Sequence, residues 1–218
     1  MLETIKEFIF NFETRLPEVI SMFGYWSYAI LFFIIFSETG LIIMTFLPGD
    51  TLLFAIGVLA AKPEIPLDIF LLNILLIIAA ISGNMLNYYI GYRFGRGIIQ
   101  SGKVPFFKPK NLEEAESFYN KYGASAVILS RFFPIVRSFV PFVAGIGRMN
   151  WMKYMLYNVI GGVSWIVSLT LAGYFFGEMP FIKDNLTYFI ILLLLLPFMP
   201  AVLSWIQRRR ARKAPDAE

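Results

Sequence analysis

The chain has 218 residues, of which 58% are hydrophobic and 16% charged, and its formal net charge is +4. A soluble domain of this length cannot cover so much apolar side chain, so the composition predicts an all-α integral membrane protein with a single domain, residues 1–218. The chain contains no cysteine and no histidine, which excludes disulfides, thiol nucleophiles, histidine bases and the usual zinc and haem ligands. We expect no metal, no cofactor, no nucleic-acid partner and no enzymatic chemistry.

The N-terminal segment, residues 2–20, alternates charged residues with apolar residues three or four positions apart. This spacing predicts an amphipathic helix at the membrane interface, with an ordinary solvated helix as the alternative. The segment contains four glutamates and lacks an apolar core, so we expect no cleavable signal peptide.

Residues 25–61 form an apolar stretch that is interrupted by Glu38, Pro48, Gly49 and Asp50. Two full crossings need about 40 apolar residues and a turn, whereas a single crossing leaves half of the stretch unused. The length therefore favours a re-entrant hairpin with its tip near residues 39–40 or 48–49. A short, kinked pair of spanning helices remains the alternative.

Residues 70–94 form a clearer apolar segment, which we expect to cross the membrane. Its Asn84 and Asn87 share one face, and they suit either the lining of a cavity or hydrogen bonding between packed helices. The basic residues between positions 93 and 110 then indicate a cytoplasmic loop. Residues 111–122 follow as an amphipathic helix on the membrane surface, with Asn111 expected as its N-cap.

Residues 124–146 are apolar but contain Arg131, Pro134, Arg137 and Pro141. A charged side chain at the bilayer centre costs roughly 2.5–3.5 kcal/mol, so it is retained where something requires it. Each proline removes a backbone donor, which is tolerated at membrane depth only inside protein or beside a wet cavity. This segment is therefore the main candidate for function.

The positions of the basic clusters indicate how residues 124–146 lie in the membrane. Expected spans at 151–176 and 186–206 lead to a basic tail, residues 207–218. If residues 124–146 crossed once, this tail would lie opposite the basic loop. If they re-enter and return, both clusters are cytoplasmic, as the positive-inside rule requires. The prediction is thus about three transmembrane helices, an outside N-terminus, and two re-entrant hairpins that open from opposite faces.

The two halves of the chain carry similar sequence. An aromatic residue and a glycine precede each hairpin, and the span after each hairpin ends in Gly-Tyr-X-Phe-Gly, at residues 91–95 and 173–177. Two hairpin-plus-span units that enter from opposite faces make an inverted repeat. Secondary transporters use this arrangement, with binding sites at the midplane.

Residues 36–40, 46–50 and 91–95, and above all Arg131-Phe-Phe-Pro-Ile-Val-Arg137 with Pro141 and Gly145, resemble the DedA family of bacterial inner-membrane proteins. That family belongs to a wider group that includes lipid scramblases of the VTT-domain type. The resemblance implies two opposed re-entrant hairpins, shaped here by Pro48, Gly49, Pro134, Pro141 and Gly145. It also implies lipid movement between leaflets, including undecaprenyl phosphate and, for some members, phosphatidylethanolamine, in dependence on the proton motive force.

The same resemblance places a functional acidic pair on Glu38 and Asp50 and an arginine pair on Arg131 and Arg137. Asn84 departs from the pattern, because many relatives are expected to carry Asp there. Proton coupling in this chain would then rest on Glu38 or Asp50 alone.

The residues themselves give the same four candidates for transport. The two acids and two bases sum to zero charge, which indicates mutual pairing at the hairpin tips. Arginine's planar fork suits bidentate contact with phosphate, and a desolvated carboxylate can carry a proton. We expect the substrate to be a membrane phospholipid or a polyprenyl phosphate, with protons as the coupling ion and Glu38 as the preferred carrier.

Several alternatives stay open at this point. The four charged residues could form a structural network that never contacts substrate. The chain could also be a proton or monovalent-cation antiporter, a phosphatidylethanolamine flippase or a non-transporting membrane organiser. A homo-oligomer is compatible with the sequence.

Overall fold

The computed structural model describes residues 18, 20, 22–41, 49–101, 109–177 and 179. Within these residues all regular secondary structure is helical, which confirms the all-α prediction for this part of the chain. The helices in chain order are α2 (Trp26–Gly40), α3 (Gly49–Ala60), α4 (Ile69–Ser101), α5 (Pro109–Tyr122), η2 (Gly123–Ser125), α6 (Ala126–Leu129), η3 (Ser130–Phe132), α7 (Pro134–Ile146) and α8 (Trp151–Phe176). Most of residues 2–20, the expected span 186–206, the tail 207–218 and Pro48 lie outside the described residues.

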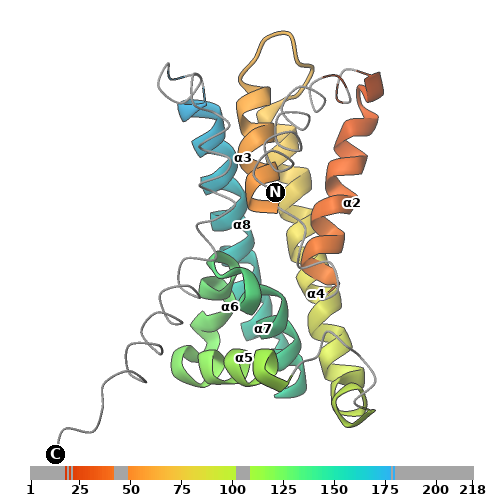
Figure 1. Ribbon diagram of the computed structural model, residues 1–218, viewed down its shortest axis with the longest axis vertical. Helices are drawn as coiled ribbons and strands as arrows, with labels where there is room; N and C mark the ends of the chain where they lie inside the picture. Colours follow the sequence, from red (N-terminus) through yellow and green to blue (C-terminus); the bar gives the residue numbers. More distant parts are fainter. Residues whose placement is uncertain are drawn as a thin grey trace, which may run out of the picture.

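Two long helices, α4 and α8, extend through most of the height of the molecule (Figure 1). Ile69–Gly95 and Trp151–Phe176, of 27 and 26 residues, are long and apolar enough to cross a membrane. Their outward faces expose large apolar side chains such as Ile74, Ile78 and Leu156. A membrane-spanning helix presents such a face to lipid. Helix α4 covers the expected span 70–94 and continues to Ser101.

The shorter helices lie at the two ends of this pair. Figure 1 shows α2 and α3 beside the upper parts of α4 and α8, with α5, α6 and α7 beside the lower parts. Helix α5 begins at Pro109, so the expectation that Asn111 caps it is wrong.

The chain breaks between α6 and α7. Phe133 is extended, with φ −122° and ψ 106°, and Pro134 begins α7. The residue before a proline is pushed out of the helical region, which accounts for a break at this residue. Pro141 lies inside α7, where its missing N–H leaves the carbonyl of Arg137 without its usual helical donor.

Glycines allow the short helices to pack closely on the long ones. Between α3 and α8, a Cβ added to Gly57 or to Gly173 would collide with the carbonyl oxygen of Thr170 or of Phe54, respectively. Between α7 and α4, a Cβ added to Gly145 or to Gly91 would collide with the carbonyl oxygen of Tyr88 or of Phe142, respectively. The contacting pair Phe142 and Gly145 of α7 has the same sequence spacing as the pair Phe54 and Gly57 of α3. The pair Thr170 and Gly173 of α8 likewise has the same spacing as the pair Tyr88 and Gly91 of α4.

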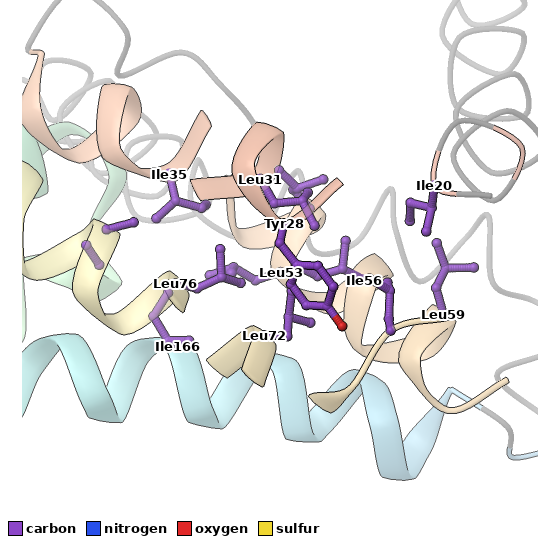
Figure 2. Packing of buried hydrophobic residues seen from close by; sticks show 14 of the residues in the cluster. Ile20, Tyr28, Leu31, Ile35, Leu53, Ile56, Leu59, Leu72, Leu76 and Ile166 are labelled. Carbon is purple, nitrogen blue, oxygen red and sulfur yellow. The ribbon is translucent and has the colours of Figure 1, made fainter. Parts of the chain in front are cut away.

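Buried apolar side chains form two clusters. Figure 2 shows the cluster that joins α2, α3, α4 and α8, with Leu31, Leu53, Leu76 and Ile166 among its labelled members. The other cluster gathers around α7 and includes Phe142. The charged residues that were predicted from the sequence lie on α2, α3 and α7 and in η3.

Candidate functional site

Three of the four predicted charged residues form one buried cluster, the Arg137 cluster, defined as Arg137, Glu38 and Asp50. Arg137 Nη2 pairs with Glu38 Oε1, and Arg137 Nη1 lies 3.1 Å from Asp50 Oδ1. The side chains of Arg137 and Glu38 are 8% and 0% exposed, whereas that of Asp50 is 24% exposed. The cluster therefore joins α2, α3 and α7 through ion pairs, and its formal charge is −1.

The start of α3 holds both carboxylates. The backbone N–H of Gly49, the first residue of α3, donates to Glu38 Oε1 at 3.2 Å. A Cβ at Gly49 would collide with the Glu38 carboxylate, so only glycine allows this approach. Asp50 lies in the first turn of the same helix. Unpaired N–H groups and the helix dipole favour negative charge at this end of a helix.

Arg131 has different surroundings, because its described hydrogen bonds go to neutral oxygens. Its Nη2 donates to Asn158 Oδ1 at 2.6 Å, to the Asn158 carbonyl at 3.3 Å and to the Ala80 carbonyl at 3.5 Å. With its side-chain amide oriented to satisfy both neighbours, Asn84 accepts from Arg131 Nη2 at 3.0 Å and donates to the Thr39 carbonyl at 3.2 Å. The expectation that all four charges pair with one another is therefore wrong for Arg131, which forms no ion pair with the described acids.

Trp165 of α8 connects the two arginine environments and was not predicted from the sequence. Its indole Nε1 donates to Asp50 Oδ1 at 2.8 Å, and its ring centroid lies 5.5 Å from the Arg137 guanidinium carbon and 5.9 Å from that of Arg131. Tryptophans of membrane proteins are enriched at the interfaces, so a tryptophan in mid-span was a usable signal. It shares one helical face with Tyr154 and Asn158, at spacings that a search for polar faces would have detected.

The two asparagines of α4 contact both groups of short helices. Asn87 is fully buried, and its amide nitrogen donates to the carbonyls of Ser138 at 2.7 Å and Thr39 at 3.4 Å. Asn84 is also buried, and its backbone carbonyl accepts from the Tyr154 hydroxyl at 2.8 Å. Both residues thus hydrogen-bond between helices, and the prediction that they line a cavity stays a prediction.

This arrangement defines a helical membrane domain with ionisable side chains at the contact between its short helices. Such groups are expensive inside a membrane and mark substrate or ion pathways by default. The chain also matches the VTT domain family over residues 47–175.

Curated relatives agree with this assignment. Protein DedA of Escherichia coli strain K12 is 42% identical over 205 residues, which cover 94% of each chain. Uncharacterized membrane protein Rv0364 of Mycobacterium tuberculosis strain H37Rv is 38% identical over 186 residues, 85% of this chain and 82% of the relative. Inner membrane protein YqjA of E. coli K12 is 34% identical over 173 residues, 78% and 75% of the two chains. No solved structure matches the chain.

The chain therefore belongs to the DedA family of VTT-domain membrane proteins. It is a protein of the bacterial inner membrane. The family resemblance that was stated from Arg131 to Gly145 is confirmed.

Proposed function

We propose that this chain translocates an anionic lipid phosphate, such as undecaprenyl phosphate, between the leaflets of the inner membrane with proton coupling. The observation that carries the proposal is the buried Arg137 cluster, with a second buried arginine on the other side of Trp165. Guanidinium forks match phosphate geometry, and carboxylates that share an arginine can exchange it for a proton. The chain is then a transporter and performs no covalent chemistry on its substrate.

The proposal includes two re-entrant hairpins, α2–α3 and α6–α7. At 1.5 Å per residue, the 15, 12 and 13 residues of α2, α3 and α7 reach only about 18–23 Å, less than the roughly 30 Å of a hydrocarbon core. The matched glycine contacts of α3 with α8 and of α7 with α4 support an inverted repeat. The contact between the hairpins then lies near the midplane.

Coupling follows from competition for the arginines. A phosphate that approaches Arg137 displaces a carboxylate, and a desolvated carboxylate that loses its counter-charge takes up a proton. Glu38 is the preferred carrier because it is fully buried and its Oε2 has no hydrogen-bond partner in the described part of the chain. Asp50 is more exposed and is also held by Trp165. A proton from the outer, more acidic side would then move inward with the headgroup.

Purified protein in liposomes tests the proposal. Leaflet exchange of labelled polyprenyl phosphate, phosphatidic acid and phosphatidylethanolamine should be measured with and without an imposed pH gradient. We expect faster inward exchange of the two phosphate lipids when the outside is acidic. Equal exchange of phosphatidylethanolamine would instead identify a phosphatidylethanolamine flippase, and proton flux without lipid exchange would identify an antiporter. No exchange and no flux would favour a membrane organiser.

The re-entrant arrangement has a separate test. Reporters fused after Phe107 and after Lys213 should both be cytoplasmic, and one fused after Lys62 should be periplasmic, because both basic clusters face inward. A periplasmic signal at Lys213 would contradict the arrangement with three spans and two hairpins.

A further inference from the structure

Arg131 is a buried cation for which the described residues provide no counter-ion. The residue is 3% exposed, and its described hydrogen bonds go to the side-chain and backbone oxygens of Asn158, to Asn84 and to the carbonyl of Ala80. Its Nε has no hydrogen-bond partner within the described ranges. No described carboxylate lies within ion-pair distance of its guanidinium.

A buried charge of this kind is energetically unfavourable unless it is paired with an opposite charge. Neutral amides and carbonyls replace only part of the lost hydration, and the Trp165 ring contributes a further cation–π attraction. Arg137 lies only six positions away but is already paired with two carboxylates. An anion that bound first at Arg137 would have to break buried ion pairs, and breaking such pairs is strongly destabilising. At Arg131 it would break none.

We infer that Arg131 is the group that first receives the phosphate of the lipid, and that Asn158 and Asn84 hold its guanidinium in place for that contact. The inference rests on the proposed function and gives the two arginines different roles. Arg137 holds α2, α3 and α7 together until the phosphate has been captured. Asn158 and Asn84 are positioning residues, because they act through Arg131.

The surroundings of Arg131 favour a lipid phosphate over free inorganic phosphate. Phe132 and Phe133, the next two residues, are 52% and 40% exposed. Gly161 and Gly162 of α8 lie against the Arg131 side chain, where a Cβ at either position would approach it to within 3.1 to 3.5 Å. A lipid tail can therefore remain on the exposed phenylalanine surface while its phosphate binds the neighbouring guanidinium, which contacts the α8 backbone at these glycines and the Trp165 ring. Inorganic phosphate has no apolar part that would use this surface.

Asn158→Asp is the decisive variant. It places a carboxylate of the same shape at the position of the Asn158 Oδ1 atom, 2.6 Å from Arg131 Nη2, and so fills the site with a permanent counter-ion. Asn73→Asp is the matched control. Asn73 is an amide of α4 that accepts a hydrogen bond from Thr170 at 2.7 Å, and none of its described hydrogen bonds involves an arginine.

Binding of dioctanoyl phosphatidic acid to the purified full-length protein should be measured by calorimetry, with inorganic phosphate and dioctanoyl phosphatidylcholine as comparison ligands. We expect phosphatidic acid to bind the wild type and Asn73→Asp equally, and Asn158→Asp at least tenfold more weakly. Arg131→Gln should abolish binding, and it answers the same question if Asn158→Asp fails to accumulate. Unchanged binding in Asn158→Asp or in Arg131→Gln overturns the inference, as does inorganic phosphate binding as tightly as phosphatidic acid.

Leaflet exchange by the same proteins separates this inference from the proposed function. If wild type binds phosphatidic acid through Arg131 but exchanges no lipid, the proposed function fails and the binding site stands. If wild type exchanges phosphate lipids and Asn158→Asp does so equally well, the function stands and the role of Arg131 as first receptor is overturned.

Discussion

The contact of α3 with α8 and the contact of α7 with α4 are built alike but carry different chemistry. Both use a pair of glycines that approach backbone carbonyls of the facing helix. The helices at one end supply the carboxylates of Glu38 and Asp50, whereas those at the other end supply the guanidiniums of Arg131 and Arg137. The two ends therefore use the same type of helix packing, but one end carries the acidic residues and the other carries the basic residues. The two ends are held together by attraction that neither end could produce by itself.

Replacing each arginine by glutamine should give the largest difference. Arg137→Gln leaves the buried carboxylate of Glu38 and the partly exposed carboxylate of Asp50 without their cation and should lower the free energy of unfolding by about 3–5 kcal/mol. Arg131→Gln removes a charge that has no described carboxylate partner, so its loss should be smaller, about 1–2 kcal/mol from unpaired amides. Thermal unfolding in one detergent measures both, and equal losses would show that the two environments do not differ in energy.

The duplicated packing predicts matched losses. Gly57→Ala and Gly145→Ala each force a methyl group against a backbone carbonyl, and each should destabilise the protein by about 1–3 kcal/mol. Gly97→Ala is a suitable control, because nothing lies within 4 Å of a Cβ at that position. Unfolding of all three variants should be followed under the same conditions. A loss at only one of the two packed glycines would break the proposed equivalence of the two ends.

Lysine at either arginine position tests geometry at constant charge. Arg137→Lys cannot reach both carboxylates from two nitrogens, and Arg131→Lys loses the planar fork that a phosphate requires. We expect both proteins to insert into the membrane and to lose most lipid exchange. Complementation of a deletion strain provides a second measurement. Lysine variants that work as well as wild type would show that positive charge alone is sufficient.

The smallest structural change should remove only the response to pH. Glu38→Gln keeps the shape of the side chain and an acceptor oxygen for the N–H of Gly49, so the fold should persist. In sealed vesicles the variant should show no acceleration of lipid exchange when a pH gradient is imposed. If the gradient still accelerates exchange, Glu38 is not the coupling residue, and Asp50→Asn becomes the next variant to measure.

The sequence predicted the features that depend on composition and on local chain geometry. Apolar length indicated helices at 70–94 and 151–176. Pro134 was expected to shape the second hairpin, and the structure has its helix break at the preceding residue, Phe133. Zero net charge over four residues indicated ion pairing, which the structure shows for the Arg137 cluster. These inferences need only neighbours in sequence or a sum of charges.

The features that were missed depend on contacts between distant helices. The amide that holds Arg131 comes from Asn158 on α8, and no local pattern identifies that partner. The mid-span position of Trp165 sets it apart in the sequence, but its hydrogen-bond acceptor, Asp50 of α3, is known only from the folded structure. The Gly-Tyr-X-Phe-Gly segments were recognised as a repeat from the sequence. The backbone carbonyls that Gly91 and Gly173 approach could not be identified from the sequence, because they belong to other helices.

Trp165 also gives the protein an internal optical reporter. Of the four tryptophans in the sequence, Trp26 and Trp151 are 74% and 44% exposed, whereas Trp165 is 2% exposed. A variant that combines Trp26→Phe, Trp151→Phe and Trp205→Phe would emit from Trp165 alone. Because its N–H donates to Asp50 and its ring lies beside two guanidiniums, any rearrangement of those charges alters the field around the indole. Its fluorescence spectrum can therefore follow the state of the site during turnover without an attached dye.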